Sequence, residues 1–218
     1  MEKKITKEMF NLPNAGEVIL NLVREGAVID EEIHLKVFAL DNAAEIMLEY
    51  VKFGWRLCEE AQLKVFDLPN AAEILLEHVK HGYELFYAKA QLKVFDLSNA
   101  AEILLEYVKH HYLSDKAELK VFELPDEKAA EIMLEYVKHD YWLCDEAQLK
   151  VFGLPNVAEI LLEYVKPGWW LCDEAELKVF DLPDEKAAEI MLEYTKRHKL
   201  CPDAQKLYDE LMAKSAKG

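Results

Sequence analysis

Four cysteines occupy one position of a repeated pattern, with a serine in one further copy: Cys58, Cys144, Cys172, Cys201 and Ser114. Thiols arranged in this way could form disulfides or hold a metal ion. Stacked helices lie about 8–10 Å apart, whereas a disulfide needs Cα atoms within about 7 Å. No Cys-x-x-Cys pair is present. We therefore interpret these residues as small side chains at a helix start, reduced as in a cytosolic protein.

Three histidines also share one repeat position, namely His81, His110 and His139, and His111 stands beside the second. A zinc ion needs each ligand nitrogen at about 2.0–2.1 Å, which side chains one helix spacing apart do not provide. A histidine near a helix C-terminus instead interacts favourably with the helix dipole. The sequence therefore predicts helix-end residues here, with no metal site and no cofactor.

Glu73 and Glu77 have the spacing that places two carboxylates on one helical face, as in the acid and base pair of a glycosidase. Such a pair needs two unequal environments within one pocket. The same pair recurs in five further copies, which indicates a solvated face. Gly-x-Ser-x-Gly, phosphate-binding glycine loops and His-Glu-x-x-His are absent from the sequence. We therefore predict no catalytic residue and no enzyme.

Aromatic residues gather between the copies, in segments that vary while the rest of the unit does not. All four tryptophans lie there, and Trp, Tyr and Arg dominate protein interfaces. The residue after a helix-ending glycine can instead pack back on the last turn, as at Trp55 or Trp169. The same segments also contain Phe86 and Tyr87. The predicted partner contacts are Trp55, Arg56, Tyr83, Tyr112, Tyr141, Trp142, Trp169 and Trp170.

The elements that position these residues come from one unit copied along the chain. The string Leu-Lys-Val-Phe occurs six times at spacings of 27 to 30 residues, with degenerate copies at both ends. The predicted repeats are 7–34, 35–62, 63–91, 92–118, 119–148, 149–176 and 177–205, with a cap at 206–218. Together they predict one domain over residues 1–218.

The second half of each unit predicts a helix. Asn70 precedes an Ala-Ala-Glu segment whose glutamate, Glu73, completes a capping-box pattern. Apolar residues then follow helical spacing. Gly82 stands where a helix C′ residue is expected.

The first half of the unit admits two interpretations. Ala61, Leu63 and Val65 alternate as in a strand, but acids such as Glu59 at its start favour a helix that ends at Pro69. The predicted fold is all-α: a right-handed or near-straight α-solenoid of seven short helix-turn-helix repeats plus a C-terminal capping helix. A leucine-rich-repeat-like α/β solenoid is the alternative.

Over the whole chain this architecture resembles the helix-pair solenoids that include tetratricopeptide and HEAT repeats. The unit is shorter than either, and their signature motifs are absent. The resemblance implies a scaffold that binds proteins or peptides along an extended face.

The chain carries 26 Lys plus Arg against 42 Asp plus Glu, a formal charge of −16. Nucleic acid and anionic membranes are disfavoured as partners because both need a basic surface, whereas a basic protein or peptide is compatible. No apolar run reaches the roughly 20 residues of a membrane span, and no signal peptide is recognisable. We therefore expect a cytoplasmic protein.

The predicted function is that of a non-enzymatic protein- or peptide-binding repeat scaffold. Two alternatives remain open from the sequence. One is an acidic mimic of nucleic acid that sequesters a basic DNA-binding protein, and the other is an engineered or consensus array without a natural ligand. The sequence predicts neither the oligomeric state nor the face that a partner would contact.

Overall fold

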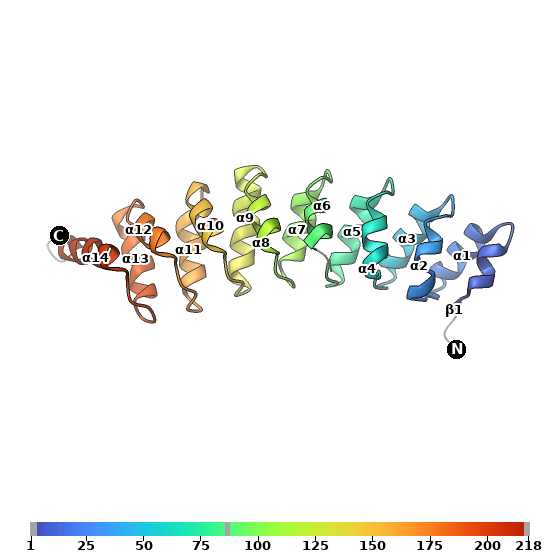
Figure 1. The fold of residues 1–218 in the computed structure, drawn as a ribbon, viewed down its shortest axis with the longest axis horizontal. Helices are drawn as coiled ribbons and strands as arrows, with labels where there is room; N and C mark the ends of the chain where they lie inside the picture. Colours follow the sequence, from blue (N-terminus) through green and yellow to red (C-terminus); the bar gives the residue numbers. More distant parts are fainter. Residues whose placement is uncertain (1–3, 86–87, 216–218) are drawn as a thin grey trace. The chain divides into compact units, whose positions relative to one another are not determined.

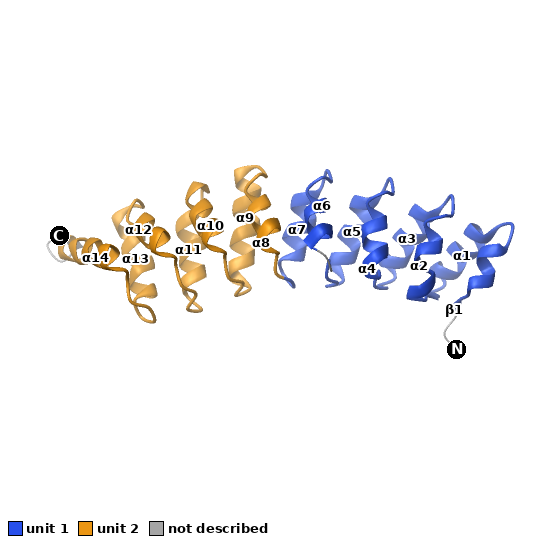
Figure 2. Cartoon of the chain, in the orientation of Figure 1, with its two compact units in different colours: residues 1–111 blue, residues 112–218 orange. Residues whose placement is uncertain are grey.

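A computed structural model describes residues 4–85 and 88–215, and these residues are mostly helical. Phe86 and Tyr87 lie outside the described residues. The chain divides into two compact units, unit 1 (residues 1–111) and unit 2 (residues 112–218) (Figure 2). The single domain expected over 1–218 stays a prediction.

Unit 1 alternates short first helices with longer second helices. Within the unit, consecutive second helices pack on each other (Figure 1). Two strands of two residues each, β1 (Lys4–Ile5) and β2 (Val28–Ile29), pair in parallel. The helices are the 3-10 helix η1 (Lys7–Asn11), α1 (Ala15–Arg24), α2 (Glu31–Val37), α3 (Ala43–Lys52), α4 (Glu59–Val65), α5 (Ala71–Lys80), α6 (Ala88–Val94) and α7 (Ala100–Tyr107).

Unit 2 has the same alternation and ends in a longer helix. The second helices α9, α11 and α13 pack in chain order, the first helices α8, α10 and α12 do the same, and α14 packs on α12 and α13 (Figure 1). The bounds are α8 (Asp115–Val121), α9 (Asp126–Lys138), α10 (Asp145–Lys150), the 3-10 helix η2 (Val151–Gly153), α11 (Val157–Val165), α12 (Asp173–Val179), α13 (Asp184–Tyr194) and α14 (Pro202–Ser215). The all-α prediction is confirmed.

The strand alternative for the first half of the unit is wrong, because α4 is helical and buries Ala61 and Val65 completely. The helix ends at Val65, earlier than predicted. The amide of Leu68 bonds to the Val65 carbonyl at 2.9 Å in a tight turn. Because Pro69 disfavours helical geometry at the residue before it, the chain leaves the helix before the proline.

The capping box predicted at Asn70 does not form. Asn70 precedes α5, but its side chain makes no hydrogen bond to that helix, and its φ of −108° and ψ of 26° are not the extended geometry of a capping residue. Its Nδ2 instead donates to the carbonyl of Ala44 in the preceding repeat at 3.0 Å. Asn42 makes the same kind of bond to Gly16. The asparagine therefore joins neighbouring repeats.

The helix-ending glycine is confirmed at Gly82, which has φ +72°. In unit 2, Asp140 adopts the same left-handed geometry with φ +61°. Because a side chain is strained there, Asp140→Gly is expected to raise the free energy of unfolding by about 0.5–1 kcal/mol. Urea unfolding followed by circular dichroism measures this change.

Gly82→Ala is the matched control, since a Cβ at Gly82 would meet nothing within 4 Å. Only the backbone conformation is then perturbed, so this substitution should lower stability by about 1 kcal/mol. A loss of stability in Asp140→Gly would contradict the prediction.

Candidate functional site

Four of the predicted contact residues are partly buried between repeats, each at the first loop position after a helix end. We call them the first loop column. In unit 1 the Tyr83 hydroxyl donates to the Gly54 carbonyl at 2.8 Å. In unit 2 the indole N–H of Trp169 donates to the Asp140 carbonyl at 3.1 Å. These bonds connect each loop to the end of the preceding repeat. The first loop column comprises Trp55, Tyr83, Tyr141 and Trp169.

The remaining predicted contact residues are exposed, and we call them the second loop column. This column comprises Arg56, Tyr112, Trp142 and Trp170. In unit 2 the exposed fractions are 59% for Tyr112, 49% for Trp142 and 50% for Trp170. In unit 1 the column holds Arg56, which forms an ion pair with Glu31. Large aromatic rings are therefore presented to solvent at one repeated position of unit 2, and their role as partner contacts stays a prediction.

The sequence analysis missed a column of polar side chains inside the first helices, which we call the buried polar column. Each member is between 0% and 5% exposed, and each bonds to the second helix of its own repeat, to the following loop, or to both. A signal exists in the sequence, because every copy places a polar residue just before its Leu-Lys-Val-Phe segment. The column comprises His34, Gln62, Gln91, Glu118, Gln148 and Glu176.

Gln148 shows what this column does. The two N–H groups of its Nε2 are shared among three acceptors, the Leu143 carbonyl at 3.1 Å, the Tyr164 hydroxyl at 3.2 Å and the Trp170 carbonyl at 3.3 Å. Its Oε1 accepts the amide of Cys172 at 2.8 Å. One buried amide therefore holds the loop backbone at Trp170 while the indole ring stays half exposed.

Other members of the column hold the loop in the same way. Gln62 Nε2 donates to the Glu84 carbonyl at 2.8 Å. Glu118 Oε1 accepts the amide of Cys144 at 3.0 Å, and Glu176 Oε2 accepts that of Cys201 at 2.7 Å. The buried polar column is therefore a structural feature of both units.

Burial changes the ionisation of several groups in these networks. It raises the pKa of Glu118 to about 8 and lowers the pKa of His78 to about 4. His34 accepts the Cys58 amide at Nδ1, so its proton sits on Nε2, which faces the Tyr50 hydroxyl. The two histidines are therefore neutral at pH 7.

The four cysteines are free and half-buried, and Cys58, Cys144 and Cys172 immediately precede first helices, as the sequence predicts. Burial is the main cause that raises the pKa of each thiol, to about 11 for Cys144. A thiol with a raised pKa is protonated at neutral pH and is a weak nucleophile. The cysteines therefore have the properties of structural residues.

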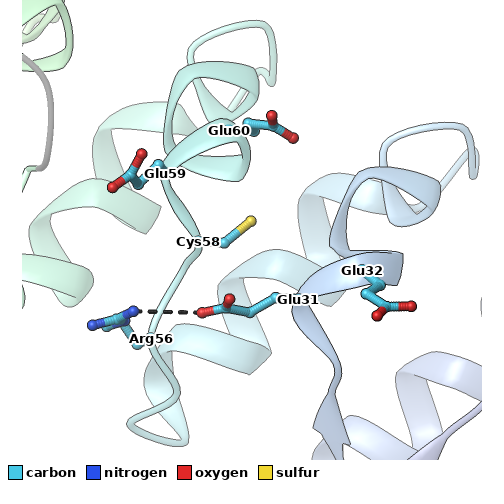
Figure 3. Close-up of a pocket in the computed structure, with 6 residues that line it drawn as sticks. All are labelled: Glu31, Glu32, Arg56, Cys58, Glu59 and Glu60. Carbon is cyan, nitrogen blue, oxygen red and sulfur yellow. Dashed lines mark hydrogen bonds and ion pairs between the residues drawn. The ribbon is translucent and has the colours of Figure 1, made fainter.

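A cavity of about 380 Å³ lies in unit 1 between the starts of α2 and α4. Arg56 Nη2 lies 3.4 Å from Glu31 Oε1, and the other carboxylates point in different directions (Figure 3). Four carboxylates and one guanidinium give the cavity a negative charge. It is lined by Glu31, Glu32, Arg56, Cys58, Glu59 and Glu60.

Carboxylates that diverge do not make a metal site. Among residues 4–85 and 88–215, no three histidine, cysteine, aspartate or glutamate side chains form a group that could hold a metal ion. Within the same ranges, every helix is too short or too polar to cross a membrane.

Comparison with known proteins gives no match to this chain among protein-family models, curated proteins or solved structures.

Proposed function

We propose that this chain is a non-enzymatic scaffold that binds a protein or peptide through the exposed loops of unit 2. The architecture supports the proposal, because stacked helix pairs similar to tetratricopeptide and HEAT repeats provide one loop position several times over. We further propose that the scaffold acts in the cytoplasm, where its free cysteines would remain reduced.

The observation that carries the proposal is the exposure of Trp142 and Trp170. Both rings are about half exposed at equivalent positions of neighbouring repeats. Buried hydrogen bonds hold the backbone beside them, as Gln148 does at Trp170. A fixed aromatic side chain loses little conformational entropy on binding, which is a property of interface hot spots.

Selection of a displayed random peptide library against the folded chain tests this function. We expect peptides whose affinity falls by about 10-fold or more in the double variant Trp142→Ala/Trp170→Ala, since each buried aromatic contact contributes about 1–2 kcal/mol. Fluorescence anisotropy of the selected peptides measures the change.

Leu192→Ala is the matched control, because Leu192 is 53% exposed in unit 2 but lies on α13. Circular dichroism should show that all variants keep their helix content. Selection that yields no peptide, or peptides that bind the double variant as well as the parent, would refute the proposed function.

A further inference from the structure

We propose that Trp142, Trp170, Asp115 and Asp145 form an acid–aromatic edge on unit 2 that binds an extended peptide with arginine at every third position. This inference rests on the proposed function, because it names the chemistry of the peptide that the same loops would bind.

Unit 1 contains an internal example of the contact. Arg56 belongs to the second loop column, and its guanidinium lies 3.4 Å from the carboxylate of Glu31 at the start of α2, in the preceding repeat (Figure 3). A guanidinium beside this loop position is therefore within reach of the acid at the neighbouring helix start.

In unit 2 a tryptophan replaces the arginine, while the acid is kept. Trp170 stands two residues before Cys172, as Arg56 stands two residues before Cys58. Asp145 opens α10 as Glu31 opens α2.

The packing of the first helices supports this equivalence of position, because α10 packs on α12 as α2 packs on α4. Burial raises the pKa of the Cys172 thiol, and the nearby charge of Asp145 raises it further. Glu31 acts in the same way on Cys58. Asp145 therefore has the same position relative to the Trp170 loop as Glu31 has relative to the Arg56 loop.

The junction between α8 and α10 repeats the arrangement with Trp142 and Asp115. There, burial raises the pKa of the Cys144 thiol to about 11, with further contributions from Glu118 and Asp115. Unit 2 therefore has two successive junctions in which an exposed indole takes the loop position of Arg56 and an aspartate takes the helix-start position of Glu31.

The acids of this edge are available to a partner. Asp115 and Asp145 are exposed, and neither forms an ion pair with any lysine or arginine in the described part of the chain. The first two positions of α8, α10 and α12 hold five acids and one base, Lys116. At the loop position where unit 1 has Arg56, the two junctions of the edge therefore hold a tryptophan and no cation.

An arginine from a partner fits both groups of each junction. A guanidinium stacks on the face of an indole and forms two parallel hydrogen bonds with a carboxylate. Lysine offers only a compact charge that remains strongly hydrated. Arginine is therefore the side chain that this pairing favours.

The repeat spacing determines where the arginines should lie in the peptide. Packed helices are about 8–10 Å apart, and an extended chain advances about 3.3 Å per residue. Three residues of extended peptide therefore cover one repeat, which gives the pattern Arg-x-x-Arg.

Three labelled peptides of equal length test the inference by fluorescence anisotropy. The first has arginine at every third position between glycine and serine, the second has glutamate at those positions, and the third has its arginines adjacent to each other. We expect the first to bind at least about 10-fold more tightly than the other two. Its affinity should fall as salt rises from about 0.05 M to 0.5 M.

Two double variants locate the binding site. Trp142→Ala/Trp170→Ala and Asp115→Asn/Asp145→Asn should each weaken the spaced arginine peptide by about 10-fold. The matched controls, Leu192→Ala and Asp181→Asn, change an exposed leucine and an exposed acid of unit 2 outside the edge. They should leave the affinity within about 2-fold.

Equal or tighter binding of the glutamate peptide, no binding of the spaced arginine peptide, or no effect of the two double variants would overturn the inference. If displayed peptides without arginine still depend on Trp142 and Trp170, the proposed function stands and only its basic specificity fails. If no displayed peptide depends on these tryptophans, the proposed function itself fails.

Discussion

Replacing Gln148 with alanine is expected to lower the free energy of unfolding by about 3 kcal/mol. Gln148 is fully buried, and its side-chain amide has four hydrogen-bonding partners. Its loss leaves the Cys172 amide and the Leu143 carbonyl without this partner. Each unsatisfied buried group costs about 1–3 kcal/mol, so the effect should exceed that of an ordinary surface substitution. Urea unfolding measures it.

Gln205→Ala is the matched control. Gln205 lies at the equivalent position of α14, but it is exposed, and its side-chain amide donates to Asp209 in the same helix. Its replacement should change stability by about 0.5 kcal/mol or less. Equal losses in the two variants would show that the buried hydrogen bonds of Gln148 do not stabilise unit 2.

The helices could be predicted from the sequence because their signals are local. Apolar spacing, acids at helix starts and Gly82 at a helix end depend on residues within a few turns of each other. Repetition strengthened each signal, since one pattern recurred throughout the chain. The local rule nevertheless placed the end of α4 too late, at Pro69 instead of Val65.

The bonds between repeats could not be predicted in this way. Gln148 follows Ala147 on a short helix, and its polarity alone is typical of a solvent-exposed side chain. Its partners Trp170 and Cys172 lie 22 and 24 residues further along the chain. Asn70 likewise carried a local capping signal, but its side chain bonds to Ala44 in the preceding repeat. Tertiary contacts decided the role of both residues.

The candidate site could be located from the sequence only to within a loop. Trp169 and Trp170 are adjacent and of one type, and only the position of Trp169 directly after Gly168 offered packing on the helix end as an alternative to a partner contact. Trp169 donates its indole N–H to the Asp140 carbonyl and is partly buried, whereas Trp170 is 50% exposed. The direction of each side chain depends on how the loop backbone is held, which is a property of the packed repeats.

Glu118→Gln is expected to stabilise the protein at alkaline pH, by on the order of 3 kcal/mol, and to have little effect near pH 4.5. Burial raises the pKa of Glu118 from its ordinary value of 4.5 to about 8. Below pH 4.5, the ordinary pKa, the Glu118 carboxyl is protonated in both the folded and the unfolded chain. Between these two pH values the unfolded chain releases a proton that the folded chain retains, so stability falls as pH rises. Above about pH 8 both chains have released this proton, so the stability falls no further.

Glutamine at position 118 has no ionisable carboxyl, and its side-chain oxygen can still accept the amide of Cys144. Gln148 at the equivalent position accepts the Cys172 amide, as Glu118 accepts that of Cys144. Urea unfolding at several pH values from 5 to 9 should therefore give parent and variant curves that diverge as pH rises. Glu146→Gln, an exposed acid on α10, should give a curve that stays parallel to that of the parent. Parallel curves for Glu118→Gln would show that Glu118 ionises equally in the folded and unfolded chains, and that its burial carries no cost in stability.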